Sequence, residues 1–305
     1  MKNMSLAVVG SVALDSIRTP FKSVARVLGG SCTYFSYAAS FFTPVKMVGV
    51  VGMDFPAKYL CELKGRGIDT EGVEVAAGKT FSWTGEYKFD MNVRETLKLD
   101  LNVFASFSPK VPDSYKKSTH LFLANINPGL QLRVLEEISS ARLVACDTMD
   151  IWIKSDRLKL LQLLKKVDIL FLNDSEAREL SGEANLIKAA AKVKKLGPEI
   201  VIIKKGEHGS ILFSKDWHFV APAYPLENAI DPTGAGDSFA GGFMGYISTV
   251  KKITKEEIKS ALVFGTAAAS FCVEDFSVNR FRKADRAAIN KRYKEIRTFT
   301  QFKDL

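Results

Sequence analysis

The sequence predicts an α/β fold with a central, mostly parallel sheet, helices on both of its faces and a small second sheet. Strand-like and helix-like stretches alternate along most of the chain, and one hairpin with period-two hydrophobicity interrupts them. The 305 residues, 47% of them hydrophobic, can bury a large core as one α/β domain or as two smaller ones. A disordered or purely fibrous chain is not expected.

The first elements follow a strand, helix, strand order. Residues 6–10 and 45–52 are short apolar runs typical of buried strands, and residues 31–42 between them predict a helix with Ser31 as its N-cap. The alternation returns later, with strands expected at residues 120–126, 142–148, 168–174 and 199–206, and helices at residues 128–140, 155–167, 175–182 and 185–197. A parallel sheet of this kind carries its ligand crevice at the carboxyl ends of the strands.

Residues 81–103 break this rhythm. From Phe81 to Phe89, and again from Leu97 to Val103, apolar residues alternate with polar ones, which predicts a β-hairpin with one apolar face. The main domain, a second subunit or a bound ligand could cover that face. We interpret the hairpin as a lid, and an ordinary edge hairpin packed on its own domain is the alternative.

The net charge of +9 raises the question of a nucleic-acid partner. Much of the excess lies in residues 279–297, where acidic residues are interleaved and apolar residues recur at near-helical spacing, at Ala287, Ile289, Tyr293 and Ile296. This pattern predicts an amphipathic helix with a solvated face, whereas an anionic substrate or weak nucleic-acid contact are the alternatives. The chain has no dense basic arm, so we expect no nucleic-acid partner.

No apolar run reaches the roughly 18 residues that a membrane-spanning helix needs, and the first 16 residues lack a signal-peptide pattern. The four cysteines are scattered among apolar neighbours without metal-type spacing, at Cys32, Cys61, Cys146 and Cys272. Reduced, buried thiols are the best interpretation. We therefore expect a soluble, cytoplasmic protein without a membrane partner.

The stretch DPTGAGDSF, from Asp231 to Phe239, carries the chemistry. Extended residues 218–225 precede it and helix-compatible residues 237–248 follow Gly236, so the glycines form the entry turn of a helix. The free N–H groups and the helix dipole make such a turn an anion site, and Gly234 and Gly236 leave no side chain in the way of a phosphate. Asp237 beside that anion is a candidate general base. A Gly-x-Gly turn alone would indicate no more than a plain N-capped helix.

The complete string resembles the C-terminal signature of the ribokinase (PfkB) family of carbohydrate kinases. The resemblance implies that Gly234, Ala235 and Gly236 form the anion hole, that Asp237 activates the acceptor hydroxyl, and that Asp231 belongs to the nucleotide side. It extends over nearly the whole chain, through the stretches at residues 10–15, 28–42, 48–70, 173–180 and 201–213. It also implies a three-layer, ribokinase-like single domain over residues 1–305, whose lid is built mainly from about residues 11–28 and 80–107.

Further site residues follow from those stretches. On the substrate side the resemblance assigns Asp15, Gly29 and Gly30. On the nucleotide side it assigns Asn173 and Glu176 to Mg²⁺, through water, and it places Lys205 and Gly206 at the nucleotide turn. From the residues alone, Asn173 and Glu176 could equally be helix-start residues, Asp15 a cap and Lys205 an exposed lysine before a turn.

Two departures from the family pattern bear on the substrate. Tyr34 stands where many sugar kinases have a hydroxyl-binding asparagine, which disfavours ribose or fructose and offers a stacking face. Residues 146–153 replace an Asp-Pro-Asn-x-Arg motif, so the arginine that would meet a sugar phosphate is missing, although Arg94 in the hairpin is a candidate substitute. The aromatic residues of the hairpin suit a nucleoside base and suit a dimer interface equally well.

We expect an ATP-dependent, Mg²⁺-dependent phosphotransferase that acts on a primary hydroxyl of a small sugar or related compound. A nucleoside kinase of the same family is the alternative, and a non-catalytic sugar or nucleoside sensor is the alternative from another class. The resemblance suggests a homodimer formed through the lid. A requirement for a monovalent cation remains open.

Overall fold

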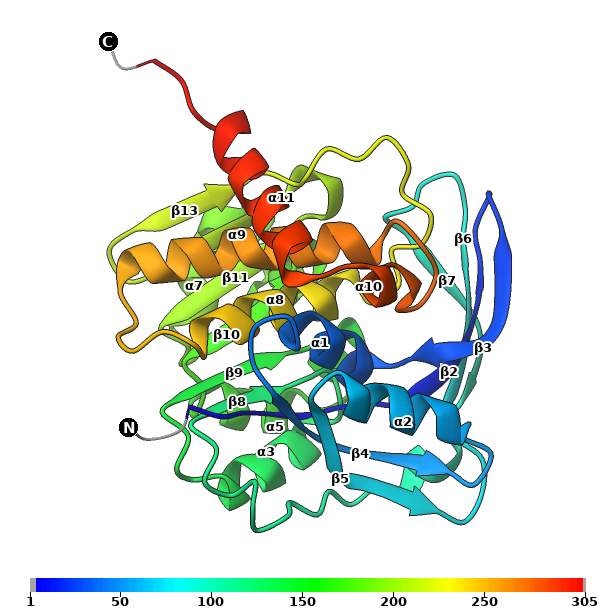
Figure 1. Cartoon of the computed structure of the whole chain (residues 1–305). Coiled ribbons are helices and arrows are strands. Elements are labelled where there is room, and N and C mark those ends of the chain that lie inside the picture. Colours follow the sequence, from blue (N-terminus) through cyan, green and yellow to red (C-terminus); the bar gives the residue numbers. More distant parts are fainter. Residues whose placement is uncertain (1–3, 304–305) are drawn as a thin grey trace.

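The computed structural model describes residues 4–303. A nine-stranded sheet in the order β13-β12-β11-β10-β9-β8-β1-β4-β5 forms its centre. All neighbouring pairs are parallel except the two that involve β12, and Figure 1 shows the sheet between layers of helices. The strands are β1 Leu6–Val9, β4 Val45–Gly52, β5 Ile68–Ala76, β8 His120–Leu123, β9 Leu143–Asp147, β10 Ile169–Asn173, β11 Ile200–Lys204, β12 Ser210–Phe213 and β13 His218–Ala221.

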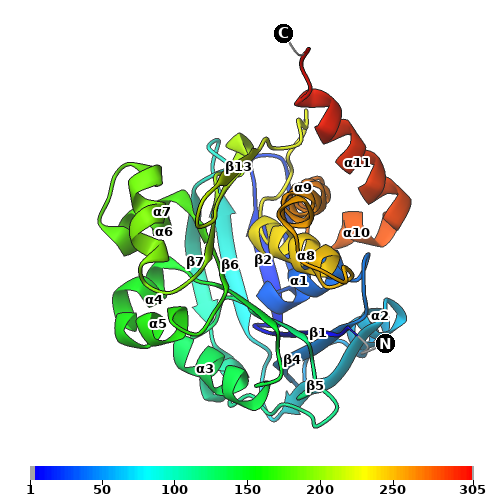
Figure 2. The ribbon, with the colours of Figure 1, turned by 90° about the vertical axis from the view of Figure 1, so that its left-hand side faces the viewer.

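Helices cover both faces of this sheet, as Figure 2 shows. One layer contains α1 Ser31–Ala39, α2 Ala57–Gly65, α8 Ala235–Ile247, α9 Lys255–Cys272, α10 Asn279–Lys283 and α11 Arg286–Phe299. The other contains α3 Pro128–Glu137, α4 Asp150–Ser155, α5 Arg157–Leu164, α6 Asp174–Ser181 and α7 Leu186–Lys194. Alternate residues of a strand enter opposite cores: Leu6 and Val8 pack in the first layer's core, and Ala7 and Val9 in the second. The predicted three-layer α/β class is confirmed.

A second sheet of four strands stands at one side of the molecule (Figure 1), in the order β3-β2-β6-β7. Its strands are β2 Ala13–Arg18, β3 Ser23–Gly29, β6 Ser82–Tyr87 and β7 Arg94–Asp100. One side packs through Ile17 and Tyr87 against Phe276, which follows α9. On β7, Leu97, Leu99 and Leu101 just beyond the strand remain 44–49% exposed. We call Leu97, Leu99 and Leu101 the β7 leucine row.

Most sequence-predicted elements are present, and the differences have local causes. The N-cap of α1 is Gly30, with φ of 94°, and not Ser31, which begins the helix. The period-two pattern extended to Val103, but β7 ends at Asp100, because a 3₁₀-helix begins at Asn102 and runs to Ser106. The short helix α4 was not predicted; it begins within the stretch that departs from the family motif.

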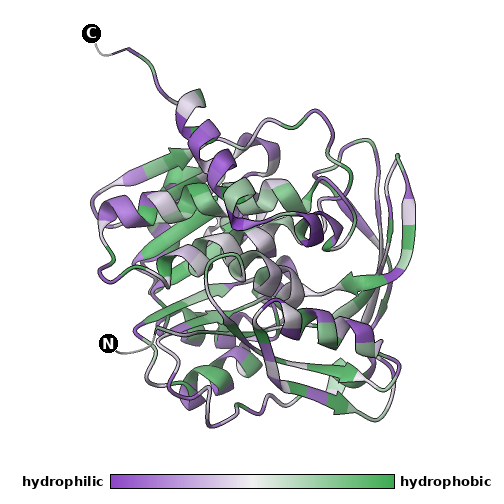
Figure 3. Ribbon diagram, viewed as in Figure 1, coloured by the Kyte–Doolittle hydropathy of each residue, from purple (hydrophilic) through white to green (hydrophobic). Residues whose placement is uncertain are grey.

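The basic C-terminal segment forms α10 and α11, and Figure 3 shows α11 as mainly hydrophilic, in contrast to the hydrophobic central strands. Ile289 and Ile296 are buried as predicted, but Ala287 is exposed, and the buried neighbour on this helix is Arg292. Its guanidinium lies 3.6 Å from the ring centroid of Phe271 and donates to Glu274 and to Ser270, each at 2.8 Å.

All four cysteines are free, and Cys32, Cys146 and Cys272 are buried. The prediction was wrong for Cys61, which is exposed on α2. Among residues 4–303 no helix is both long and apolar enough to cross a membrane.

Candidate active site

Three neighbouring parallel strands end in polar residues at one edge of the main sheet. Asp147 is the last residue of β9, Asn173 of β10 and Lys204 of β11, and the register pairs Asn173 directly with Lys204. Parallel strands bring their carboxyl ends together, and a ligand crevice is expected there. The start of α8 reaches the same place, because a methyl group built on Gly236 would lie 3.1 Å from the Lys204 Nζ.

The glycine turn begins α8 as the sequence predicts. Gly234 is the N-cap, in the left-handed region with φ of 77°. The Thr233 N–H donates to Asp231 Oδ1 at 2.9 Å and the Ala235 N–H donates to Pro232 O at 3.1 Å, which fixes the turn. The N–H groups of Gly234 and Gly236 have no acceptor within residues 4–303. They are therefore free to bind an anion at the positive end of the helix.

Asp237 lies in the first turn of α8 and is half-buried. Burial and the charge of Asp147 raise the pKa of Asp237 to about 7, and Lys204 and Arg94 act in the opposite direction. A carboxylate with a pKa near neutrality can accept a proton from an alcohol more readily than an ordinary aspartate. The site thus places a proton acceptor beside an anion-binding turn.

Lys204 and Asp147 are site residues that reasoning from the sequence missed. The Lys204 Nζ lies 2.6 Å from Asp147 Oδ2, and the two side chains are only 17% and 5% exposed. Burial opposes the charge of Lys204, but Asp147 and Glu176 raise the pKa of its ammonium above the ordinary value. Each of the two residues ends an apolar strand, and this position is the sequence signal that could have identified them.

Lys205, which the resemblance assigns to the nucleotide turn, follows the last residue of β11 and begins the next turn. Its N–H donates to Gly209 O at 2.8 Å and its carbonyl accepts from His208 N, so its backbone shapes the turn after β11. Gly206 follows with φ of 55°. A methyl group on Gly206 would lie 2.4 Å from Asn92 Oδ1, so the tip of the β6–β7 hairpin reaches this turn.

The predicted substrate residues lie together on the other side of the turn. Asp15 on β2 is buried against Gly29, where a Cβ would lie 1.9 Å from Asp15 Oδ2. A Cβ on Gly30 would lie 2.4 Å from the Ser11 carbonyl oxygen, so both positions require glycine. Burial and the charge of Asp231 raise the pKa of Asp15 to about 8, against the hydrogen bond from the Gly30 backbone.

Among the buried polar groups without partners within residues 4–303, two bear directly on the acceptor side and the turn. They are the hydroxyl of Tyr34, which is 1% exposed, and Oδ2 of Asp231, which is fully buried. Burial and the charges of Asp231 and Asp15 raise the pKa of Tyr34, so its phenol stays protonated. Buried polar groups are normally hydrogen-bonded, and such exceptions mark places where a ligand or ion belongs.

Asn173 and Glu176 form a reciprocal capping box at the start of α6. Asn173 Oδ1 accepts from the Glu176 N–H at 2.8 Å, and Glu176 Oε2 accepts from the Asn173 N–H at 2.7 Å. Burial raises the pKa of Glu176, and the charge of Lys204 partly offsets this. The capping box uses the one side-chain oxygen of Asn173 and Oε2 of Glu176, and it leaves Oε1 of Glu176 available.

The small sheet contributes Tyr87 and Arg94 to the site. The Thr233 hydroxyl donates to the Tyr87 hydroxyl at 3.2 Å, which ties β6 to the glycine turn. Arg94 pairs with Tyr87 across the strands, and its charge lowers the pKa values of Asp237 and Glu176. Trp83 donates from Nε1 to Thr96 at 3.1 Å and is half-buried, whereas Phe89 is 96% exposed and contributes nothing to this face.

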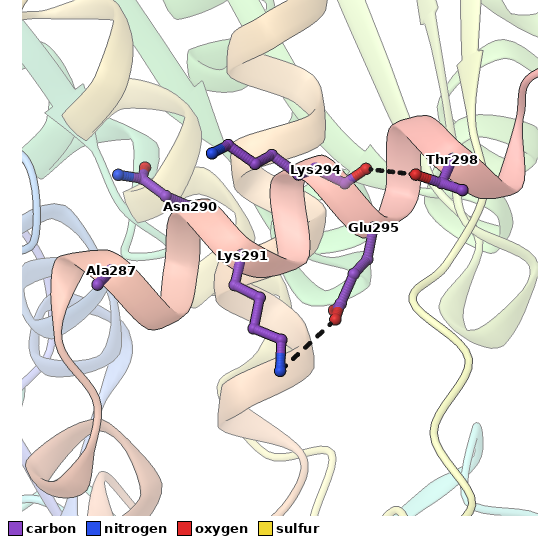
Figure 4. Close-up of a pocket in the computed structure, with 6 residues that line it drawn as sticks. All are labelled: Ala287, Asn290, Lys291, Lys294, Glu295 and Thr298. Atoms are coloured by element: carbon purple, nitrogen blue, oxygen red, sulfur yellow. Dashed lines mark hydrogen bonds and ion pairs between the residues drawn. The ribbon is translucent and has the colours of Figure 1, made fainter.

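A hollow of about 430 Å³ lies elsewhere, on the outer face of α11 (Figure 4). All six of its lining residues come from that one helix, and Lys291 and Glu295 pair across it at 3.9 Å. It contains no residue of the candidate site.

A parallel α/β sheet whose strand ends carry an anion-binding turn and a carboxylate is the arrangement expected of a phosphoryl-transfer enzyme. Comparison with protein families agrees: residues 5–284 match the model of the pfkB family carbohydrate kinases, and the chain belongs to this family. The protein is therefore a kinase, a phosphotransferase whose acceptor is an alcohol group.

Curated relatives and solved structures are similar over most of the chain. The cytidine kinase of Thermococcus kodakarensis is 28% identical over 79% of this chain and 87% of its own. The nucleoside kinase of Methanothermobacter thermautotrophicus is 27% identical over 90% of this chain and 91% of its own. A crystal structure of a putative ribokinase II from E. coli with ATP and Mg²⁺ has a TM-score of 0.79 at 18% identity, covering 96% of this chain and 100% of that one.

Proposed function

We propose that this kinase transfers the γ-phosphate of ATP to the primary hydroxyl of a nucleoside, with Asp237 as the general base. The observation that carries the proposal is the position of Asp237 in the first turn of α8, directly after the glycine turn, where its charge also raises the pKa of the buried Asp15. An alcohol held by Asp15 would stand beside both the base and the bound phosphate. Proximity of this kind supplies much of the catalysis in phosphoryl transfer.

The acceptor site favours a nucleoside for two reasons. Tyr34 places a phenol hydroxyl, without a partner within residues 4–303, where many sugar kinases carry an asparagine, and the half-buried Trp83 adds aromatic surface from the lid. Two of the similar proteins are a cytidine kinase and a nucleoside kinase. A free sugar is the second candidate, because Asp15 and Gly30 would hold sugar hydroxyls in either case.

On the phosphate side, we assign the γ-phosphate to the N–H groups of Gly234 and Gly236, which have no acceptor in the described part of the chain. Ala235 contributes less to phosphate binding, because its N–H already donates to the carbonyl oxygen of Pro232. We place the nucleotide along the turn at Lys205 and Gly206. In the transfer, the acceptor oxygen forms its bond to phosphorus as the bond to the leaving ADP breaks, and the hydroxyl proton passes to Asp237.

Magnesium fits this site through water. Among residues 4–303 no three His, Cys, Asp or Glu side chains gather as a metal cage, and Mg²⁺ commonly takes one or two protein oxygens together with waters and phosphates. Glu176 Oε1 and Asn173 at the strand end are suitable outer partners. Bound there, Mg²⁺ would neutralise phosphate charge, while the chain's own groups orient the acceptor and take its proton.

A monovalent cation is also part of the proposal. Oδ2 of Asp231 is a buried oxygen without a partner in the described chain, and burial raises the pKa of this carboxyl to about 6. A cation beside it would satisfy the oxygen and stabilise the turn that it supports through Thr233.

We further propose that the small sheet is the lid, built from parts of residues 11–28 and 80–107, and that two copies pair through it. The exposed β7 leucine row supports this pairing, because large apolar rows on a sheet are normally covered. The four free thiols support a reducing, cytoplasmic location.

The test is release of ADP from ATP and Mg²⁺ in the presence of nucleosides, free sugars and sugar phosphates. Asp237→Asn should lose nearly all turnover and still bind nucleotide, whereas Glu256→Gln, in the first turn of α9 and exposed, should match the wild type. Full activity of Asp237→Asn would refute the assignment of the base. Binding of nucleosides without turnover on any acceptor would instead favour the sensor.

A further inference from the structure

Lys204 is a buried cation whose hydrogen-bonding capacity is only partly used. Its ammonium has three donors, and within residues 4–303 its one hydrogen-bond acceptor is Asp147 Oδ2, at 2.6 Å. Asp147 is itself held at the end of β9, where Gln131 Nε2 donates to its carbonyl at 3.1 Å. The ion pair therefore fixes the lysine head in one place and leaves donors available.

Those donors lie beside the anion-binding turn. The space where a methyl group on Gly236 would stand is 3.1 Å from the Lys204 Nζ, so no side chain separates the ammonium from the N–H of that residue. An anion bound by the Gly236 N–H would be within reach of the same ammonium. A buried charge at this distance acts more strongly than a solvated one, because little water screens it.

The charge balance of the region points the same way. Asp147, Glu176 and Asp237 all interact with Lys204, and Arg94 approaches from the lid. Three carboxyl groups would repel a phosphate at this place unless a positive charge offset them, and Lys204 is the cation among them. The ion pair accounts for only one of the three, Asp147.

We propose that Lys204, held by Asp147, contacts the transferring phosphoryl group and is a catalytic residue of this kinase. Asp147 is the positioning residue. The inference rests on the proposed function and adds to it the group that meets the charge on the phosphoryl oxygens. Lys204 keeps its proton throughout: the hydroxyl proton passes to Asp237, and ADP leaves with the electron pair of the broken bond.

The variants separate this role from a structural one. Lys204→Met alone leaves Asp147 as an unpaired buried charge and is expected to destabilise the fold, so the Lys204→Met/Asp147→Asn double variant is the main test. Lys204→Arg keeps the charge. Lys192→Met is the matched control, because it removes a lysine from an ion pair with Glu183 on the surface.

Two measurements decide the proposal. With the best acceptor, the double variant should lose about 100-fold or more in kcat at little change in acceptor KM, and Lys204→Arg should recover part of the loss. Aluminium fluoride imitates the transferring phosphoryl group when it binds together with ADP. In calorimetry, the double variant should bind ADP alone as tightly as the wild type does, but it should bind ADP no more tightly when aluminium fluoride is added. Wild-type kcat together with an unchanged aluminium fluoride effect would overturn the proposal.

The two proposals fail differently. If the wild type turns over no acceptor, the proposed function is refuted, and the aluminium fluoride measurement, which needs no acceptor, still decides the role of Lys204. If the wild type is active and the double variant behaves like Lys192→Met, the function stands and Lys204 is structural.

Discussion

The ring of Tyr34 lies directly against the backbone of Gly234. A methyl group on Gly234 would stand 2.2 Å from Cγ of that ring, which no real contact permits. The glycine turn and α1, which carries Tyr34, are therefore packed on each other, so we expect a change at one to disturb the other. This contact also accounts for the glycine at the N-cap of α8.

Gly234→Ala should lower the free energy of unfolding by about 2–5 kcal/mol, because it adds left-handed strain to the collision with Tyr34. Gly67→Ala is the matched control, since Gly67 has the same φ of 77° and open space around it. It should lose only about 1–2 kcal/mol. Urea denaturation measures both, and equal losses would show that the contact is unimportant.

Tyr34→Phe should leave the protein as stable as the wild type or slightly more stable, because the lost hydroxyl has no partner in the described chain. If that hydroxyl bonds the acceptor, kcat/KM should fall by about tenfold or more, equivalent to about 1–3 kcal/mol. Thermal unfolding and steady-state kinetics test the two parts. Unchanged kinetics would remove Tyr34 from the acceptor site.

Activity should rise with pH through about 7. Burial and Asp147 raise the pKa of Asp237 to that value, and Lys204 and Arg94 limit the rise, so below it the base is protonated. Log kcat/KM, which reports the free enzyme, should fall by about one unit per pH unit on the acid side. An apparent pKa near 4 in this profile would contradict the raised pKa of Asp237. An apparent pKa near 8 would assign the acid side of the profile to Asp15 instead.

Potassium should raise both the melting temperature and kcat/KM relative to choline chloride at the same ionic strength. The physical reason is the buried Oδ2 of Asp231, which has no partner within residues 4–303 and which a cation would neutralise. Asp231→Asn should lose the response to potassium. A wild-type protein that behaves identically in both salts would rule out this cation site.

Leu99→Glu should convert a dimer into a monomer, because it places a charge in the middle of the β7 leucine row. Leu158→Glu, on α5 and 78% exposed, is the control and should leave the assembly unchanged. Sedimentation velocity distinguishes the two masses. A wild-type monomer at micromolar concentration would refute pairing through the lid.

Local patterns predicted much of this molecule. The period of hydrophobicity marked the buried strands, and residues 231–239 predicted the glycine turn at the start of α8 with Asp237 in its first turn. Two glycines followed by an aspartate at a helix entry are typical of a phosphate-binding turn, so the anion site there stays a prediction. The family and the kinase class followed from the same motif and are confirmed. Lys204 shows the limit of local patterns, because it looks like its neighbour Lys205 until the sheet pairs it with Asp147.

What the sequence by itself determined is the order of strands and helices, the α/β class and the glycine turn that begins α8, all of which depend on short-range periodicity and turn chemistry. Only the tertiary structure brought Lys204 to Asp147, 57 residues away along the chain, and pressed Tyr34 onto Gly234. The physical reason is that the side chains of different strands and helices meet through sheet register and layer packing, which no local stretch of sequence encodes.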